Sequence, residues 1–135
     1  MTTITGACAC GGVRIHAEAD PVFVAVCHCR GCQRRSGSAF AVIVALPAAS
    51  LKIDGSVTTY DSTGDSGKGV RDRFCPRCGS QVARDVDVFP DLIMIRAGVL
   101  DDPGWVKPAM EIYCGEKQPW VVLGGDMKNF AKMPG

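Results

Sequence analysis

Three cysteines lie within the segment 27–32, in the pattern C-H-C-x-x-C. A cysteine thiolate binds zinc at about 2.3 Å, so two thiolates on one tetrahedral ion lie roughly 3.8 Å apart. A tight turn brings residues i and i+3 to that separation, and a bent segment can do the same for i and i+2. Three sulfur ligands from one loop leave the fourth position of a zinc ion open, which is typical of a reactive site. The spacing therefore predicts a reactive zinc site at Cys27, Cys29 and Cys32.

Two further cysteine pairs are spaced as in structural zinc sites. Cys8 and Cys10 form a C-x-C pair, and Cys75 and Cys78 form a C-x-x-C pair that is followed by Gly79. A glycine at that place tolerates the positive φ that a zinc knuckle requires. Four cysteines form the usual closed structural site, which here would join the N-terminal segment to the middle of the chain. We predict one four-cysteine structural zinc site, with separate buried thiols as the alternative.

The order of the cysteines resembles that of the glutathione-dependent formaldehyde-activating enzyme family. The shared patterns are C-x-C-G, C-H-C-x-x-C-x-R and F-C-x-x-C-G, followed by the segments 92–95, 97–102 and 110–113 and by Trp120. The resemblance extends from about Gly6 to Met133. It implies a single-domain β-tent fold, in which antiparallel sheets meet near a zinc ion held by two knuckles. It also implies a zinc-dependent carbon–sulfur lyase.

The namesake reaction of this family adds glutathione to formaldehyde and gives S-hydroxymethylglutathione. The resemblance implies that Cys27, Cys29 and Cys32 hold a second zinc ion and are catalytic, with a small thiol and a small aldehyde as partners. A zinc ion with three thiolate ligands is a modest Lewis acid, but it can hold an incoming thiol as the nucleophilic thiolate. The alternative is a second closed zinc site, in which Cys114 or His28 supplies the fourth ligand.

Two arginines beside the predicted reactive site are candidates for binding the thiol. Glutathione carries two carboxylates, and arginine forms bidentate pairs with carboxylate groups. Arg34 and Arg35 are therefore expected to anchor the substrate, with a solvated positive surface as the alternative. His28 lies between two predicted ligands and is expected to point away from their metal, and Trp120 is expected to pack in the core.

The composition is that of a small globular protein. The chain has 135 residues, of which 47% are hydrophobic, and its net charge is +1. This balance of charges argues against binding to nucleic acid or to an anionic membrane. The N-terminus lacks a signal-peptide pattern, and paired free cysteines favour a reducing cytoplasm. We predict one zinc-binding domain over residues 1–135, located in the cytoplasm, with exposed edge strands that would allow a homodimer.

Short apolar runs separated by turn residues predict a mostly β fold. Strands are expected at residues 13–18, 22–26, 40–45, 51–54, 57–60, 70–74, 81–86 and 92–97, with late edge elements near 112 and 121–123. A short helical turn is expected within residues 31–38, and a short C-terminal helix at 126–132. Glycines at 64, 67 and 69 predict a loop between two of these strands.

Two other functions stay open from the sequence. A non-catalytic zinc-binding β-tent module would use its metal sites only to hold a surface that binds a protein partner. A redox enzyme similar to methionine sulfoxide reductases would need a catalytic cysteine on a late strand, for which Cys114 is the only candidate. Its surroundings, Tyr113-Cys114-Gly115-Glu116, do not resemble the motif of those enzymes. The zinc-dependent lyase is therefore the leading hypothesis.

Overall fold

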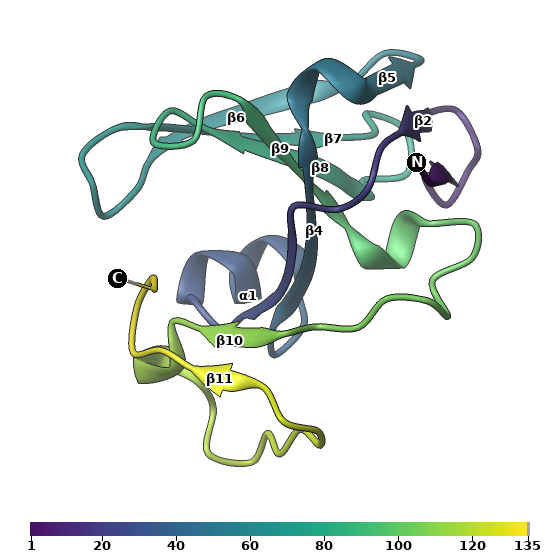
Figure 1. Cartoon of the computed structure of the whole chain (residues 1–135). Coiled ribbons are helices and arrows are strands. Elements are labelled where there is room, and N and C mark those ends of the chain that lie inside the picture. The colour runs from purple at the N-terminus through teal and green to yellow at the C-terminus, as the bar shows by residue number, and fades with distance from the viewer. Residues whose placement is uncertain (135) are drawn as a thin grey trace.

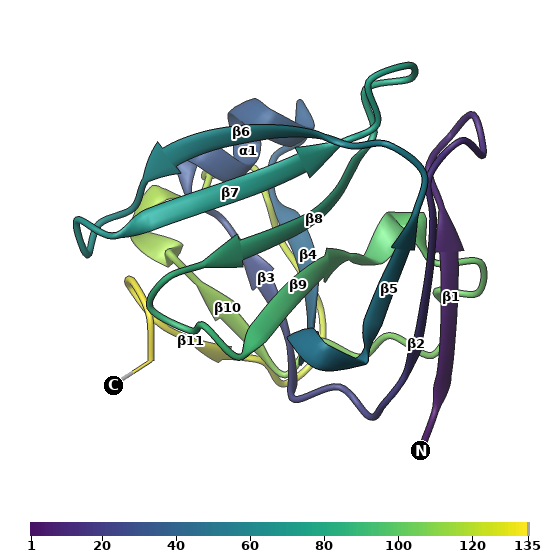
Figure 2. The ribbon, with the colours of Figure 1, turned by 90° about the horizontal axis from the view of Figure 1, so that it is seen from above.

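Two β-sheets of unequal size are the main elements of the computed structural model, which describes residues 1–134 (Figures 1 and 2). Gly135, the last residue of the predicted domain, lies outside the described residues. The small sheet has the order β1-β2-β5, with β1 (Thr3–Ala7), β2 (Arg14–Glu18) and β5 (Leu51–Asp54). The large sheet has the order β11-β10-β3-β4-β9-β8-β7-β6, with β3 (Phe23–Cys27), β4 (Ala41–Pro47), β6 (Thr58–Thr63), β7 (Gly69–Phe74), β8 (Gln81–Val86), β9 (Leu92–Arg96), β10 (Met110–Ile112) and β11 (Lys128–Asn129). The helical elements are α1 (Arg30–Ser36) and the 3₁₀ turns η1 (Ala48–Ser50), η2 (Ala97–Val99) and η3 (Cys114–Glu116).

The burial of each strand follows from its place in the sheets. β2 alternates exposed and buried residues, with Ile15 and Ala17 on the buried face, because only one face of the small sheet is covered. β3 and β4 lie in the middle of the large sheet and are buried on both faces. Their sequences are accordingly continuous apolar runs rather than alternating ones.

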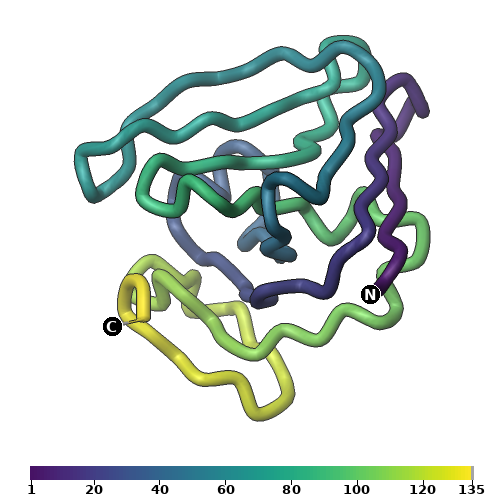
Figure 3. Tube along the Cα trace, turned by 45° about the horizontal axis from the view of Figure 1, so that its top comes forward, coloured from purple at the N-terminus to yellow at the C-terminus, as the bar shows by residue number. Residues whose placement is uncertain are grey.

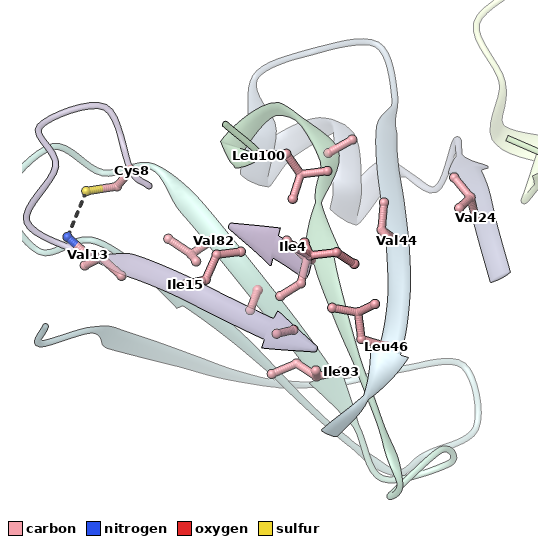
Figure 4. Close-up of a cluster of buried hydrophobic side chains, with 14 of the residues drawn as sticks. Ile4, Cys8, Val13, Ile15, Val24, Val44, Leu46, Val82, Ile93 and Leu100 are labelled. Carbon is pink, nitrogen blue, oxygen red and sulfur yellow. Dashed lines mark hydrogen bonds between the residues drawn. The ribbon is translucent and has the colours of Figure 1, made fainter. Parts of the chain in front are cut away.

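The two faces of the large sheet contribute to two different apolar clusters. Successive side chains of a strand point to opposite faces, so β4 sends Val44 and Leu46 to one side and Ile43 to the other. The first cluster lies between the two sheets and includes Ile15 of the small sheet (Figure 4). The second cluster lies on the opposite face, where Ile43 packs with Met94, α1 and the cysteines of the segment 27–32.

The prediction of a mostly β fold of the tent type is confirmed, with two departures in detail. Only antiparallel sheets were expected, but β10 pairs in parallel with both β3 and β11. The N-terminal strand β1 was not expected, and it pairs along its whole length with β2. Both departures arise from pairing between strands, which an individual segment does not encode.

Two predictions for the C-terminal part of the chain are wrong. Residues 121–123 form no strand, and Val122 is 89% exposed. Residues 126–132 form no helix, because β11 instead pairs with β10 and brings the C-terminal segment alongside it (Figure 3). Trp120, which was expected in the core, is 72% exposed.

Shortening Leu46 to alanine tests the packing between the two sheets. Leu46 is completely buried in the first apolar cluster, so the change removes apolar contacts and leaves a cavity. We expect a loss of about 2–5 kcal/mol in the free energy of unfolding, measured by urea denaturation. The control Val122→Ala, at an exposed apolar residue, should stay within about 0.5 kcal/mol of the parent. Equal effects of the two substitutions would contradict this assignment of the core.

Candidate functional site

Four cysteine sulfurs meet where the small sheet approaches the end of β7. Cys8, Cys10, Cys75 and Cys78 place their Sγ atoms within 4.8 Å of one another. The Sγ atom of Cys10 lies 3.6 Å from that of Cys8 and 3.7 Å from that of Cys75. These separations are close to the roughly 3.8 Å between two thiolates on one zinc ion. The donor set therefore fits a closed, tetrahedral metal site.

Backbone N–H groups and one hydroxyl point at these sulfurs, as expected for thiolate ligands. The N–H of Val13 donates to Cys8 Sγ at 3.2 Å (Figure 4), and the N–H of Cys78 donates to Cys75 Sγ at 3.5 Å. The Oγ atom of Ser80 lies 3.2 Å from Cys78 Sγ, and this contact is the main cause that lowers the pKa of that thiol to about 5. A lowered pKa favours the deprotonated form that binds metal.

A second group of sulfurs lies where β3 gives way to α1. Cys27, Cys29 and Cys32 place their Sγ atoms within 4.8 Å of one another, and the Sγ atoms of Cys27 and Cys32 are 3.5 Å apart. Cys29 is the N-cap of α1, and its Sγ accepts a hydrogen bond from the N–H of Cys32 at 3.2 Å. Among residues 1–134, no fourth metal-binding side chain joins this group. The donor set fits a metal ion with three protein ligands.

A buried cluster of charges lies beside the three cysteines. The carboxylate of Asp72 is fully buried, with Arg35 Nε at 2.6 Å, Arg84 Nε at 3.1 Å and Arg96 Nη2 at 4.0 Å. Arg84 Nη1 also lies 3.6 Å from Cys32 Sγ, and Arg96 Nη2 lies 3.9 Å from it. One carboxylate does not balance three guanidinium groups, so the surplus of positive charge favours the thiolate form of Cys32.

The pKa of Cys32 reflects this environment. Hydrogen bonds from the other two cysteines of the group are the main cause that lowers the pKa of Cys32, and the charges of Arg96 and Arg84 act in the same direction. Burial raises the pKa of this thiol, but by less than these contacts lower it. The site therefore favours a negative charge at the sulfur that α1 contributes.

His28 points away from the three cysteines, as predicted from its position between two ligands. Its Nε2 atom lies 2.8 Å from Glu111 Oε1, and Lys117 Nζ lies 2.9 Å from the same oxygen. Cys114 Sγ contacts the backbone oxygen of Glu111 at 3.6 Å. His28, Glu111 and Cys114 could themselves hold a metal, but the ammonium of Lys117 already neutralises the carboxylate. This network anchors the segment 27–32 to β10.

A cleft of about 720 Å³ opens above the three-cysteine group. Its lining includes all three cysteines and, on one side, apolar side chains of the large sheet. Tyr113 and the loop 63–66 lie on its lining as well. Tyr113 is the one residue other than glycine with a positive φ among residues 1–134, at 56°. Backbone strain of this kind is often found at functional sites.

The two arginines that were predicted to bind substrate lie in different surroundings. Arg35 lines the cleft, and its guanidinium pairs with Asp72. A side chain at Gly31 would collide with that guanidinium, so the glycine lets Arg35 turn back along the helix. Arg34 is exposed on α1 and does not line the cleft. Their role as carboxylate anchors stays a prediction.

The sequence analysis missed Asp72, Arg84 and Arg96 as members of the site. The sequence of β7 contains a signal for one of them. Asp72 follows Val70 by two residues, so both side chains point to the same face of the sheet. A charged residue at a position with the period of the buried face indicates a buried charge cluster.

Comparison with known proteins identifies the family. The model of the family described as glutathione-dependent formaldehyde-activating enzyme matches residues 3–116, and the chain belongs to this family. A crystal structure of a Rhodobacter sphaeroides protein matches with a TM-score of 0.60 and 23% sequence identity, over 77% of this chain and 91% of that one. This likeness supports the fold. No curated protein matches the chain.

No helix among residues 1–134 has the length and apolar character needed to cross a membrane.

Replacing one cysteine of each sulfur group tests whether each group binds a metal ion and what that ion does for the fold. We expect Cys10→Ser and Cys29→Ser each to reduce bound zinc from about two ions per chain to about one. The loss of zinc from the four-cysteine group in Cys10→Ser should also lower Tm by about 10 °C or more, because that group joins distant chain segments. Metal analysis and calorimetry measure both effects.

Cys114→Ser is the matched control, because Cys114 lies outside both sulfur groups. It should retain both zinc ions and the Tm of the parent. A fall in Tm for Cys29→Ser as large as that for Cys10→Ser would contradict the division into a structural and an open site.

Replacing Asp72 by asparagine tests the buried charge cluster. The amide keeps the shape but leaves three guanidinium groups without their shared carboxylate, so we expect a loss of about 3–5 kcal/mol in the free energy of unfolding. The control is Asp85→Asn, because Asp85 also pairs with two arginines, Arg71 and Arg73, but in a more exposed place. It should cost about 1 kcal/mol or less in urea denaturation. Equal losses in the two variants would contradict the view that burial makes the Asp72 cluster more important for stability than the more exposed Asp85 cluster.

Proposed function

We propose that this protein is a zinc-dependent carbon–sulfur lyase that adds a thiol, such as glutathione, to formaldehyde or a similar small aldehyde. The observation that carries the proposal is the open set of three sulfurs at Cys27, Cys29 and Cys32, which lines a cleft. A fully ligated site would leave no place for a substrate atom, whereas a set of three does. Membership of the family supports the same class of reaction.

The three cysteines would hold the zinc ion, and neighbouring side chains would stabilise their charge. When bound, zinc would supply a positive centre that favours the thiolate form of an incoming thiol. Arg84 and Arg96 both approach Cys32 Sγ, and their positive charges would stabilise the thiolate form of that sulfur. The cysteines of both sulfur groups are not paired in disulfides, which suits a reducing compartment. We take this compartment to be the cytoplasm.

Tyr113 is suited to meet the oxygen of the aldehyde. The addition converts a carbonyl oxygen into a hydroxyl, so a hydrogen-bond donor beside that oxygen favours the reaction. Tyr113 lines the cleft, and burial together with the charge of Asp65 raises its pKa to about 12. Its hydroxyl therefore keeps its proton at neutral pH. His28 is fully buried beside Glu111 and positions the cysteine segment.

Exchange NMR on ¹³C-labelled formaldehyde with glutathione tests the proposal. The uncatalysed addition is itself fast, so the quantity to compare is the exchange rate above that of a protein-free sample. We expect the parent protein to accelerate exchange and Cys32→Ser to return it to the protein-free rate, because that variant lacks one of the three metal ligands. The four-cysteine group is intact in this variant and should keep it folded.

Cys114→Ser provides the matched control, since it removes a thiol that belongs to neither sulfur group. It should accelerate exchange as the parent does. A parent protein that binds two zinc ions but accelerates neither this addition nor that of any other thiol would contradict the proposal. A zinc-held module that binds a protein partner would then account better for the structure.

A further inference from the structure

The cleft above the three cysteines has a wall made of apolar side chains. Phe23 of β3, Ile43 of β4 and Met94 of β9 all line it. The strand register explains this wall, because Phe23 and Met94 both align with Ala45 and therefore share one face of the large sheet. Cys27 follows Phe23 by four residues on the same strand, so its side chain lies on that face too. The wall thus leads directly to the sulfur group.

Two exposed apolar residues extend this wall to the rim of the cleft. Val88 and Phe89, in the turn between β8 and β9, are 41% and 39% exposed, and both line the cleft. Val86, at the end of β8, connects this rim with the sheet. Apolar side chains that face water beside an apolar cleft are typical of a ligand site.

The cations of the cleft are already engaged with charges of the protein. Arg35 Nε lies 2.6 Å from Asp72, and Arg84 Nε lies 3.1 Å from the same carboxylate. Arg84 Nη1 also approaches Cys32 Sγ. A carboxylate of a ligand would have to compete with these contacts.

Apart from Arg35 and Arg84, the charged side chains among the described residues that line the cleft are one cation and two acids. Lys132 is the remaining cation among the described residues that line the cleft, and Asp65 and Glu116 also line it. Tyr113 lies among them, since its N–H donates to Lys132 and its carbonyl accepts from Glu116. A thiol with two carboxylates, such as glutathione, would therefore have to share guanidinium groups with Asp72 or pair with Lys132, which lines the cleft together with two acids.

We infer that the thiol which this site takes carries an apolar aliphatic or aromatic body, which lies against Phe23, Ile43 and Met94 and under the rim of Val88 and Phe89. This inference rests on the proposed function and specifies its substrate class. In the reaction, the sulfur forms a bond to the aldehyde carbon, the carbonyl π bond breaks, and the proton of the thiol ends on the oxygen. No oxidant or reductant takes part.

A comparison of thiols in the exchange experiment tests the inference. With labelled formaldehyde, the acceleration for phenylmethanethiol, relative to its own uncatalysed rate, should exceed that for glutathione by about tenfold or more. An equal or larger acceleration for glutathione would overturn the inference while leaving the lyase intact. Acceleration only when glutathione is paired with phenylacetaldehyde would also overturn it, because the apolar group would then belong to the aldehyde.

Variants of the rim give a second test without disturbing the buried core. Val88→Ser/Phe89→Ser should reduce the preference for phenylmethanethiol over glutathione by about threefold to tenfold. The matched control is Trp120→Ser/Val122→Ser, which removes two exposed apolar residues that do not line the cleft. It should keep the preference of the parent. An unchanged preference in the rim variant would contradict the inference.

Binding provides a readout that does not depend on turnover. In the zinc-loaded protein with labelled methyl groups, phenylmethanethiol should shift the methyl resonances of Ile43 and Met94 at concentrations where glutathione does not. If no thiol is accelerated but these shifts occur, the lyase fails and the apolar binding site stands. If glutathione shifts the same methyl groups equally, or if neither compound shifts them, the inference is wrong.

Discussion

The carboxylate of Asp72 joins parts of the molecule that would otherwise repel one another. It contacts guanidinium groups from α1, β8 and β9, contributed by Arg35, Arg84 and Arg96. Buried charges without partners cost several kcal/mol, so this surplus of positive charge requires further negative groups nearby. The sulfurs of the segment 27–32 supply them, because Cys32 Sγ lies beside two of the guanidinium groups. Strands, helix and sulfur group therefore depend on one charge balance.

The two sulfur groups serve different parts of the fold. The four-cysteine group lies between the small sheet and the end of β7, and its four donors are placed so that they could complete a tetrahedral metal site. The three-cysteine group lies on the face of the large sheet that the small sheet does not cover. That face has α1 over one end and a cleft beside it. The same sheet thus has one face packed against the small sheet and the other beside the cleft.

Local sequence accounts for those features that form within one segment. Cys27 ends β3, Cys29 is the N-cap of α1 and Cys32 lies in its first turn, so the close spacing of these residues brings their sulfurs together. The central strands were predictable because burial on both faces requires apolar residues throughout. The C-terminal pairing was not predictable, since the short strand β11 has no apolar pattern and depends on β10 for its hydrogen bonds.

The sequence by itself therefore determined the family, the membership of both sulfur groups and the mostly β class of the fold. Only the tertiary structure decided that Asp72 is buried among arginines, that His28 turns to Glu111, and that apolar side chains lead from the sulfurs to the rim of the cleft. The physical reason is the distance over which each feature acts. Ligand spacing and strand patterning follow from neighbouring residues, whereas charge balance and the shape of a cleft arise from residues that only folding brings together.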